Sequence, residues 1–304
     1  MRGIRPIKKG TIMTDFIKTL ISGLNLGSIY ALIALGYSMV YGIAKMLNFA
    51  HGDIIMIGAY TAIVGVMNLG LPPFLGILLS VVVCAVLGIT IERLAYRPLR
   101  NAPSLAVLIT AIGVSYFLQN IALLIFGSEQ IAYPTITGFP SVTIGEVTVD
   151  GISVFTLVIT AVIMVGLTLF INFTKTGKAM RAVSEDKAAC SLMGINVNKT
   201  ITITFAIGSA LAALASTFYG ATYIYIRPTT GSMPGIKAFT AAVFGGIGSL
   251  PGAMLGGICL GLIEQFSKVY ISPLWANAIV FGVLIVVLIV RPTGLIGKPI
   301  SEKV

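Results

Sequence analysis

The sequence predicts an all-α fold, a polytopic bundle of transmembrane helices forming one membrane-embedded domain over residues 1–304. Of the 304 residues, 57% are hydrophobic and only 10% are charged, whereas about 25% of an average soluble domain is charged. Several apolar runs approach the ~20 residues that a helix needs to cross ~30 Å of hydrocarbon. These runs are continuous rather than alternating in polarity, which disfavours a transmembrane β-barrel.

About eight apolar segments can be delimited along the chain. They cover residues 16–37, 52–69, 74–92, 104–126, 152–172, 200–223, 239–266 and 274–291. Basic residues concentrate in the connections at 93–100 and 174–200, while residues 127–151 contain no Lys or Arg. By the positive-inside rule, the first two connections face the cytoplasm and the third faces outward.

Eight simple crossings from an internal N-terminus would place the basic connection at 93–100 outside, so two interrupted or re-entrant helices are predicted. Residues 41–58 and 244–257 each contain a polar, Gly-containing break between apolar stretches. If a half-helix enters before each break and the next helix returns to the same side, both termini are cytoplasmic. Eight crossings from an external N-terminus also place the basic connections inside, but they leave the C-terminus outside. We favour the interrupted helices, because a tail with three basic residues after position 290 should stay inside.

Other functional classes are disfavoured. The net charge of +10 is spread among apolar segments, so nucleic acid is not expected as a partner. Cys84, Cys190 and Cys259 lie far apart and have neither metal-ligand nor disulfide spacing. Residues 1–14 form a basic tail that is not expected to be cleaved, and Met13 is itself a plausible start. The sequence has no phosphate-binding loop and no catalytic triad or carboxylate pair, so no catalytic site, cofactor or metal is expected.

Polar groups inside a bilayer are functional candidates, because placing them there is costly. Asn48, His51 and Asp53 cluster at the first break, and His51 is the only histidine. One interpretation is a proton relay between His51 and Asp53. The other is that Asn48 and Asp53 cap the following helix while His51 donates to a carbonyl. Glu264 is predicted to be structural, through an i,i+4 pair with Lys268.

The connection at 174–200 is predicted to contain a short amphipathic helix on the cytoplasmic face. Ser184 can cap its start, and acidic residues in its first turn suit the positive end of the helix dipole. Gly194 supplies a stop. The candidate docking residues are Glu185, Asp186, Ala188, Ala189, Leu192, Met193 and Gly194. Such a helix either rests on membrane lipid or docks into a groove of a soluble partner.

Several motifs together resemble those of one transport family. They are GSIYALIALGYSMVYGIAKMLNFAHGD, IERLAYRPLR, AIGVSYFLQN, GINVNKTI, and GIKAFTAAVFGGIGSLPGAMLGG followed by RPTGL. These motifs span nearly the whole chain in this order. By them the chain resembles the permease subunits of ABC-type branched-chain amino acid uptake systems, the LivH type. Related permeases carry urea, short amides or other amino acids.

This resemblance implies an importer of several subunits in the bacterial inner membrane. An extracytoplasmic binding protein would deliver leucine, isoleucine or valine to this chain and a second related permease subunit, and two cytoplasmic ATPase subunits would drive alternating access. The helix at 184–194 would be the coupling helix. The NFAHGD and GIGSLPG stretches would line the substrate path through Asn48, His51, Asp53, Gly248 and Ser249. The alternative of a different class is a proton-coupled secondary transporter.

Overall fold

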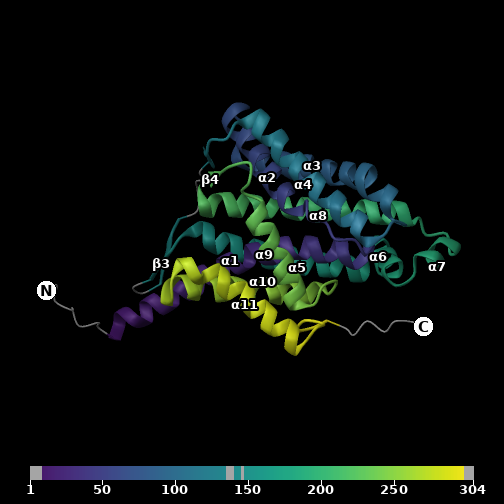
Figure 1. Ribbon diagram of the computed structural model, residues 1–304. Coiled ribbons are helices and arrows are strands. Elements are labelled where there is room, and N and C mark those ends of the chain that lie inside the picture. The colour runs from purple at the N-terminus through teal and green to yellow at the C-terminus, as the bar shows by residue number, and fades with distance from the viewer. Residues whose placement is uncertain (1–8, 135–139, 145–146, 298–304) are drawn as a thin grey trace.

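The computed structural model describes residues 9–134, 140–144 and 147–297, and most of these residues are helical (Figure 1). In chain order the helices are α1 (Lys9–Ala44), α2 (His51–Ile63), η1 (Val64–Asn68), α3 (Pro73–Ile91), η2 (Glu92–Tyr96), η3 (Arg97–Leu99), α4 (Ser104–Phe126), α5 (Gly151–Phe173), α6 (Lys175–Glu185), α7 (Lys187–Leu192), α8 (Val197–Tyr223), α9 (Ser232–Gly245), α10 (Leu250–Tyr270) and α11 (Pro273–Val290). The described strands are β1 (Ile131–Ala132), β2 (Val142–Ile144), β3 (Val147–Val149) and β4 (Tyr225–Ile226).

Seven of the described helical stretches are long and apolar enough to cross a membrane, which confirms the predicted polytopic helical bundle. They are Met13–Ala44, Pro73–Leu99, Ser104–Phe126, Gly151–Phe173, Val197–Tyr223, Leu250–Tyr270 and Pro273–Val290. The predicted segment at 239–266 is divided at its Gly-rich break into α9 and α10. The predicted segment at 52–69 is α2 continued by the π-helical turn η1.

The central helix of the bundle is α1. In the most apolar 18-residue stretch of each spanning helix, 94% of the residues of α1 are buried, compared with 17% for α4 and 11% for α11. Glycines of α10 permit this packing, because a Cβ on Gly257 would lie 2.4 Å from Ala31 Cα and one on Gly261 would lie 2.1 Å from the Gly27 nitrogen. The backbones of α1 and α10 therefore touch directly, as small residues four positions apart allow in membranes.

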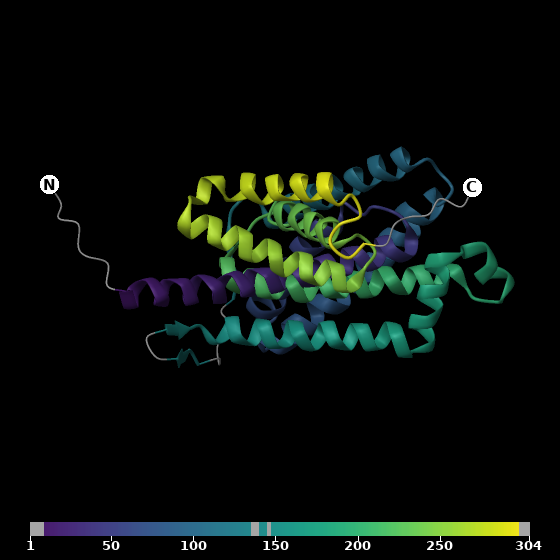
Figure 2. The ribbon, with the colours of Figure 1, turned by 90° about the horizontal axis from the view of Figure 1, so that it is seen from below.

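The direction of α1 sets the two ends of the molecule. Near its start, Phe16 packs against Phe266 of α10 with ring centroids 5.5 Å apart. Near its other end, the carbonyl of Ala44 accepts a hydrogen bond from α7, and α6 and α7 project beyond this end of the bundle (Figure 2). Residues 294–297 lie at this second end, against the break between α9 and α10. The described chain thus begins and ends at opposite ends of the bundle. That both termini are cytoplasmic stays a prediction.

Two helices, α2 and α9, have only 13 and 14 residues, which span about 20 Å, and η1 lengthens the first of them by five residues. Their starts meet inside the bundle, where a Cβ on Gly231 would lie 2.0 Å from the Gly52 carbonyl oxygen. The other end of α2 reaches the far end of the bundle, where Tyr60 stacks on Phe126 with centroids 4.1 Å apart. Residues 45–50 and α2 together thus cross the bundle, which corrects the predicted return to the same side.

The strands lie at the end of the bundle where α1 begins, as Figures 1 and 2 show. β2 and β3 form an antiparallel pair, and β1 pairs antiparallel with β4 through Ile131 and Ile226. The second pair ties the connection after α4 to the segment that leads into α9. No strand was predicted here, because two or three residues are too few to carry an alternating pattern.

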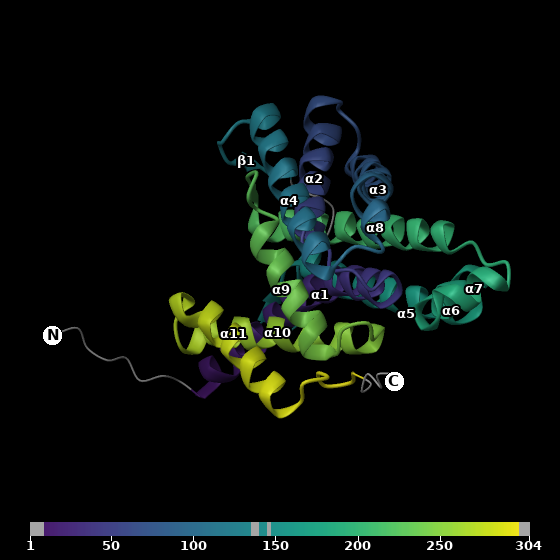
Figure 3. The same ribbon diagram turned by 45° about the vertical axis from the view of Figure 1, so that its right-hand side comes forward.

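Figure 3 shows how these elements surround α1. α2, α3 and α4 form one group beside α8, whereas α10 and α11 lie on the opposite side of α1 and α9. α9 therefore separates the two groups, and its start faces the start of α2 between them. This arrangement places the two half-helices at the middle of the molecule, where the predicted breaks can be compared directly.

Candidate functional site

The first break lies between the end of α1 and the start of α2. Lys45 has a φ of 59°, so the chain leaves α1 through a left-handed turn. Ala50 is the N-cap of α2 and provides no side-chain cap, while Asn48 Oδ1 accepts a hydrogen bond from Tyr96 Oη at 2.9 Å. The capping interpretation is thus wrong for Asn48. Asp53 does lie in the first turn of α2, where the helix dipole favours a carboxylate.

His51 is 1% exposed and packs against α1. Its ring lies edge-on to Tyr37 with centroids 5.7 Å apart, and its Nε2 would be 3.0 Å from a Cβ on Gly36. Among the described residues, Nε2 has no hydrogen-bond partner. Asp53 bonds instead to Gln119 of α4. Within the described chain, therefore, no hydrogen bond joins His51 to Asp53 as a proton relay would require.

Asp53 belongs to a polar cluster at the place where α2 and α9 begin. Gln119 Nε2 donates to Asp53 Oδ1 at 2.9 Å and lies 3.3 Å from both Ser115 Oγ and Ser232 Oγ. These four residues are called the polar junction below. The positive ends of two helix dipoles point toward it, because both α2 and α9 start there. Gln119, Ser115 and Ser232 were not among the predicted site residues.

The polar junction reaches the surface of the bundle. Asp53 is only 1% exposed, whereas the other three members are half-exposed. Beside them on α9, Met233 and Ile236 are 43% and 44% exposed. Polar groups at this depth are costly in contact with lipid, so we expect the junction to face protein or water.

The second break, between α9 and α10, is built by glycines and held by α1. Gly246 and Gly248 have φ values of 111° and 88°, which favour glycine. Ser249 is the N-cap of α10, and its Oγ accepts from the Gly252 nitrogen at 3.3 Å. Ser38 Oγ of α1 accepts from the Gly248 nitrogen at 2.9 Å. The predicted break is confirmed, and Ser249 has a capping role.

The segment after α11 completes this break. The backbone N–H groups of Leu295 and Ile296 donate to the carbonyls of Phe244 and Gly245 at 2.9 and 3.0 Å. These carbonyls belong to the last turn of α9, where the helix itself supplies no donor. The C-terminal segment thus satisfies groups that would otherwise stay unpaired inside the bundle.

The two breaks lie at different depths along α1. His51 lies beside Gly36, whereas Gly248 lies beside Gly42, six residues further along the same helix. That separation amounts to about 9 Å along the axis. Gly248 is exposed at the end of the bundle that carries α7, while His51 is buried deeper. The predicted path residues therefore form two groups and not one site.

A buried ion cluster connects α1, α9 and α10. Lys237 Nζ and Lys268 Nζ each lie 2.7 Å from Glu264 Oε1, and Tyr30 Oη donates to Glu264 Oε2 at 2.9 Å. Glu264 is 1% exposed and Lys237 is 7% exposed. The predicted i,i+4 pair between Glu264 and Lys268 is confirmed. Lys237 was missed, since it lies 27 positions away on another helix.

The connection at 174–200 contains two helices, α6 and α7, and not one. The predicted helix start at Ser184 is wrong, because this residue lies within α6. The cap of α7 is Asp186, whose Oδ1 accepts from the nitrogens of Ala188 and Ala189 at 2.8 and 2.9 Å. Asp ranks among the best N-cap residues and suits the positive end of the dipole.

The apolar residues of α7 point into solvent. Leu192 is 89% exposed and Met193 is 83% exposed, and the alanines at 188 and 189 are exposed as well. Cys190 is buried toward the bundle. Gly194 follows with a φ of 79°, which confirms the predicted stop. The helix thus presents an uncovered apolar surface at the tip of the molecule, which Figure 2 shows at the far end from the start of α1.

Lys187 anchors α7 to the bundle. Its Nζ donates to the carbonyl of Ala44 at 3.0 Å. Burial lowers the pKa of Lys187, and the positive charges of Arg100 and Lys45 act in the same direction. Several basic side chains therefore gather at this end of the bundle.

Spanning helices, two half-helices with facing starts and a polar junction between them define a membrane transport protein. Residues 19–289 match a family described as "Branched-chain amino acid transport system / permease component", and the chain belongs to this family.

Individual proteins extend the similarity over almost the full length. The chain is 45% identical over 301 residues to the high-affinity branched-chain amino acid transport system permease protein BraD of Pseudomonas aeruginosa, covering 95% of this chain and 98% of that protein. It is 44% identical over 302 residues to the LivH permease protein of the Escherichia coli K12 high-affinity branched-chain amino acid transport system, with the same two coverages. Among solved structures, PsaBC from Streptococcus pneumoniae in complex with Fab has a TM-score of 0.50 at 16% identity, covering 92% of this chain and 97% of that chain, which shows a shared fold.

Proposed function

We propose that this chain is the permease subunit of an ATP-driven importer of leucine, isoleucine and valine in the bacterial inner membrane. The observation that carries this proposal is the polar junction, a half-exposed polar cluster among apolar helices, in a chain 45% identical to BraD. The chain works with a second related permease subunit, two cytoplasmic ATPase subunits and an extracytoplasmic binding protein. ATP hydrolysis takes place in the ATPase subunits, and the permease changes which side its path faces.

The chemistry of the junction suits a zwitterionic amino acid. The carboxylate of Asp53 attracts an ammonium group, and the positive dipole ends at the starts of α2 and α9 attract a carboxylate. Met233 and Ile236 offer exposed apolar surface for a branched aliphatic side chain. Gln119 covers Asp53 in this conformation and must move before the carboxylate can reach substrate.

The face that carries the junction is where we place the second permease subunit. Substrate would pass between the two subunits, past Asp53, and leave near the second break. Gly248 is exposed and Ser249 is half-exposed at that end, so they can border the cytoplasmic mouth. Asn48 and His51 are buried, and their role is to hold the start of α2 in place.

Replacement of the carboxylate tests the path. In cells that express all partner subunits, Asp53→Asn is expected to reduce the initial rate of radiolabelled leucine uptake by about 10-fold or more, because a charge-assisted contact is lost. Glu129→Gln, which removes an exposed carboxylate outside the bundle, serves as the control and should transport normally. Uptake at the wild-type rate by Asp53→Asn, at normal membrane levels, would reject the proposed path.

The exposed surface of α7 is the proposed coupling surface. It comprises Ala188, Ala189, Leu192 and Met193, with Glu185, Asp186 and Gly194 setting its ends. An uncovered apolar surface on a short helix beyond the membrane fits a groove in a soluble partner. The concentration of basic side chains at this end of the bundle supports a cytoplasmic position for α7.

A charge on this surface tests the coupling role. Met193→Asp is expected to abolish leucine uptake and substrate-stimulated ATP hydrolysis while the subunit still inserts, because a desolvated carboxylate in the groove opposes docking. Asn172→Asp adds the same charge at an exposed site of the same end and should remain active. Normal uptake by Met193→Asp would remove α7 from the coupling mechanism.

A further inference from the structure

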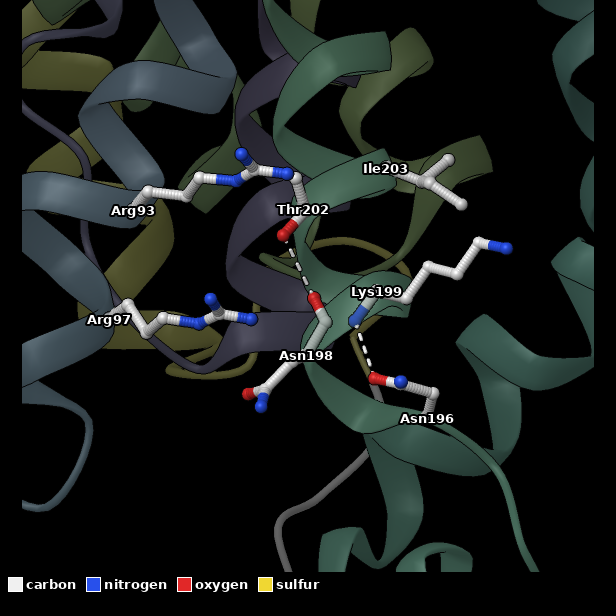
Figure 4. Close-up of a pocket in the computed structure, with 7 residues that line it drawn as sticks. All are labelled: Arg93, Arg97, Asn196, Asn198, Lys199, Thr202 and Ile203. Carbon is white, nitrogen blue, oxygen red and sulfur yellow. Dashed lines mark hydrogen bonds between the residues drawn. The ribbon is translucent and has the colours of Figure 1, made fainter.

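A cavity of about 350 Å³ lies at the α7 end of the bundle, away from the polar junction. One wall is the helical extension of α3, from which Arg93 and Arg97 extend toward α8 (Figure 4). The other wall is the first turns of α8. The polar residues that line the cavity are Arg93, Arg97, Asn196, Asn198, Lys199 and Thr202.

The lining is cationic and its charges are not neutralised. Arg93, Arg97 and Lys199 carry three positive charges, and in the described part of the chain none of them pairs with a carboxylate. The nearest acidic group, Glu92, is already bound by Arg100 and by the Thr202 hydroxyl. An anion that enters the cavity therefore meets the guanidinium groups of Arg93 and Arg97, whereas the Lys199 ammonium points away from them (Figure 4).

The start of α8 adds directed donors. α8 is 27 residues long, and the side-chain Oδ1 of its N-cap Asn196 accepts from the Lys199 nitrogen at 2.9 Å. The N–H groups of the first turn that remain free carry the positive end of the helix dipole. A phosphate oxygen is the acceptor that such a helix start and a pair of guanidinium groups bind well.

The surroundings of the cavity favour a lipid over a soluble anion. Leu94, next to Arg93, is 75% exposed, and Val86 of α3 is 57% exposed, so this side of α3 faces lipid. On α8, Ile203 lines the cavity and begins a half-exposed apolar stripe. That stripe continues along the bundle through residues 206, 207 and 210. A headgroup in the cavity can therefore keep its acyl chains against apolar helix surface.

We propose that this cavity binds the phosphodiester headgroup of an anionic phospholipid from the cytoplasmic leaflet. Arg93 and Arg97 hold the phosphate from one side, and the first turn of α8 holds it from the other. The bound lipid then links the extension of α3 to the start of α8, which follows α7 in the chain. The proposal needs only the cytoplasmic position of this end and does not depend on which amino acid is carried.

Native mass spectrometry of the full chain tests the site. The chain is reconstituted in nanodiscs of phosphatidylcholine alone or mixed with phosphatidylglycerol, and retained lipid is titrated. The double variant Arg93→Gln/Arg97→Gln is expected to bind phosphatidylglycerol about 30-fold more weakly. Lys175→Gln/Lys178→Gln removes two exposed cations of α6 outside the cavity and should bind as the unaltered chain does. Size-exclusion profiles of all proteins establish that both variants fold.

Several outcomes would overturn the proposal. These are unchanged phosphatidylglycerol binding in the Arg93→Gln/Arg97→Gln chain, or an equal loss in the α6 control. Displacement of the lipid by excess inorganic phosphate would identify a soluble-phosphate site instead. Normal lipid binding together with lost ATPase association in the Arg93→Gln/Arg97→Gln chain would assign the cavity to a protein interface.

Discussion

At the scale of single residues, the ion cluster around Glu264 offers a sharp test of buried charge in this bundle. Glu264→Gln leaves Lys237 buried without its counter-ion, and such a loss destabilises proteins by about 3–5 kcal/mol. Thermal unfolding of the purified chain in detergent should show a clear drop in midpoint. Lys268→Gln is the matched control, because the Lys268 side chain is 30% exposed and can be hydrated, so its loss should cost much less. Equal midpoints for the two variants would show that Lys237 finds another partner.

The same cluster shows which residue contacts a sequence can reveal. Glu264 and Lys268 are four positions apart on one helix, so helical geometry alone predicts their pairing. Lys237 lies 27 positions from Glu264, and Gln119 lies 66 positions from Asp53. Those contacts depend on how helices pack, which periodicity does not specify. Gln119 did carry a signal, since a polar residue within the apolar segment at 104–126 is costly unless it has a partner.

At the scale of elements, glycines decide how closely α9 and α10 pack. A Cβ on Gly256 would lie 2.1 Å from the Ala241 carbonyl oxygen, so Gly256→Ala must push the two helices apart. We expect a loss of about 1–3 kcal/mol, measured as a lower thermal midpoint in detergent. Gly282→Ala, on α11, meets nothing within 4 Å and should leave the midpoint unchanged or slightly higher. A neutral Gly256→Ala would mean that the α9–α10 contact is loose in the membrane.

Element boundaries were predictable where backbone chemistry is restrictive. Gly246, Gly248 and Gly194 have positive φ values at breaks or stops that the sequence predicts. The start of α7 could not be predicted in this way, because Ser184 and Asp186 are both good N-cap residues. Asp186 caps α7 because α6 continues through Ser184 to Glu185. The non-helical residues 45–50 of the first break have no sequence pattern that predicts them. The sequence therefore did not show where the helix before the break ends.

At the scale of the whole molecule, the structure brings the basic connections together as predicted, and it divides the chain into more passes than the eight predicted segments. Arg100 contacts Asn198, and Lys187 contacts Ala44, so the basic connections share one end of the bundle. Seven long spans and two composite passes, each a half-helix with an extended stretch, make an odd number. The described ends of the chain therefore lie at opposite ends of the bundle, and the side of the membrane that each faces stays a prediction. The predicted segment at 239–266 contains parts of both α9 and α10, so one predicted segment corresponds to two passes.

This topology leads to a prediction about access from each side of the membrane. If the α7 end is cytoplasmic, the start of α1 is external, since α1 runs the full length of the bundle. In a chain whose three cysteines are replaced by alanine, Asp15→Cys should react with a membrane-impermeant maleimide in intact spheroplasts. Ser191→Cys should react only after permeabilisation. Both positions are exposed, so access and not burial decides the result.

The opposite pattern would reverse the molecule in the membrane and place α7, with its uncovered Leu192 and Met193, on the outer face. Reaction of both cysteines only after permeabilisation would restore the prediction of two cytoplasmic termini, and α1 could then not span the bilayer in the manner described. An external α7 could not contact a cytoplasmic ATPase, so this labelling result decides whether the coupling surface and the lipid cavity are on the side that their proposed partners occupy. Because positive charge in short connections sets orientation during insertion, we expect α7 inside and Asp15 outside.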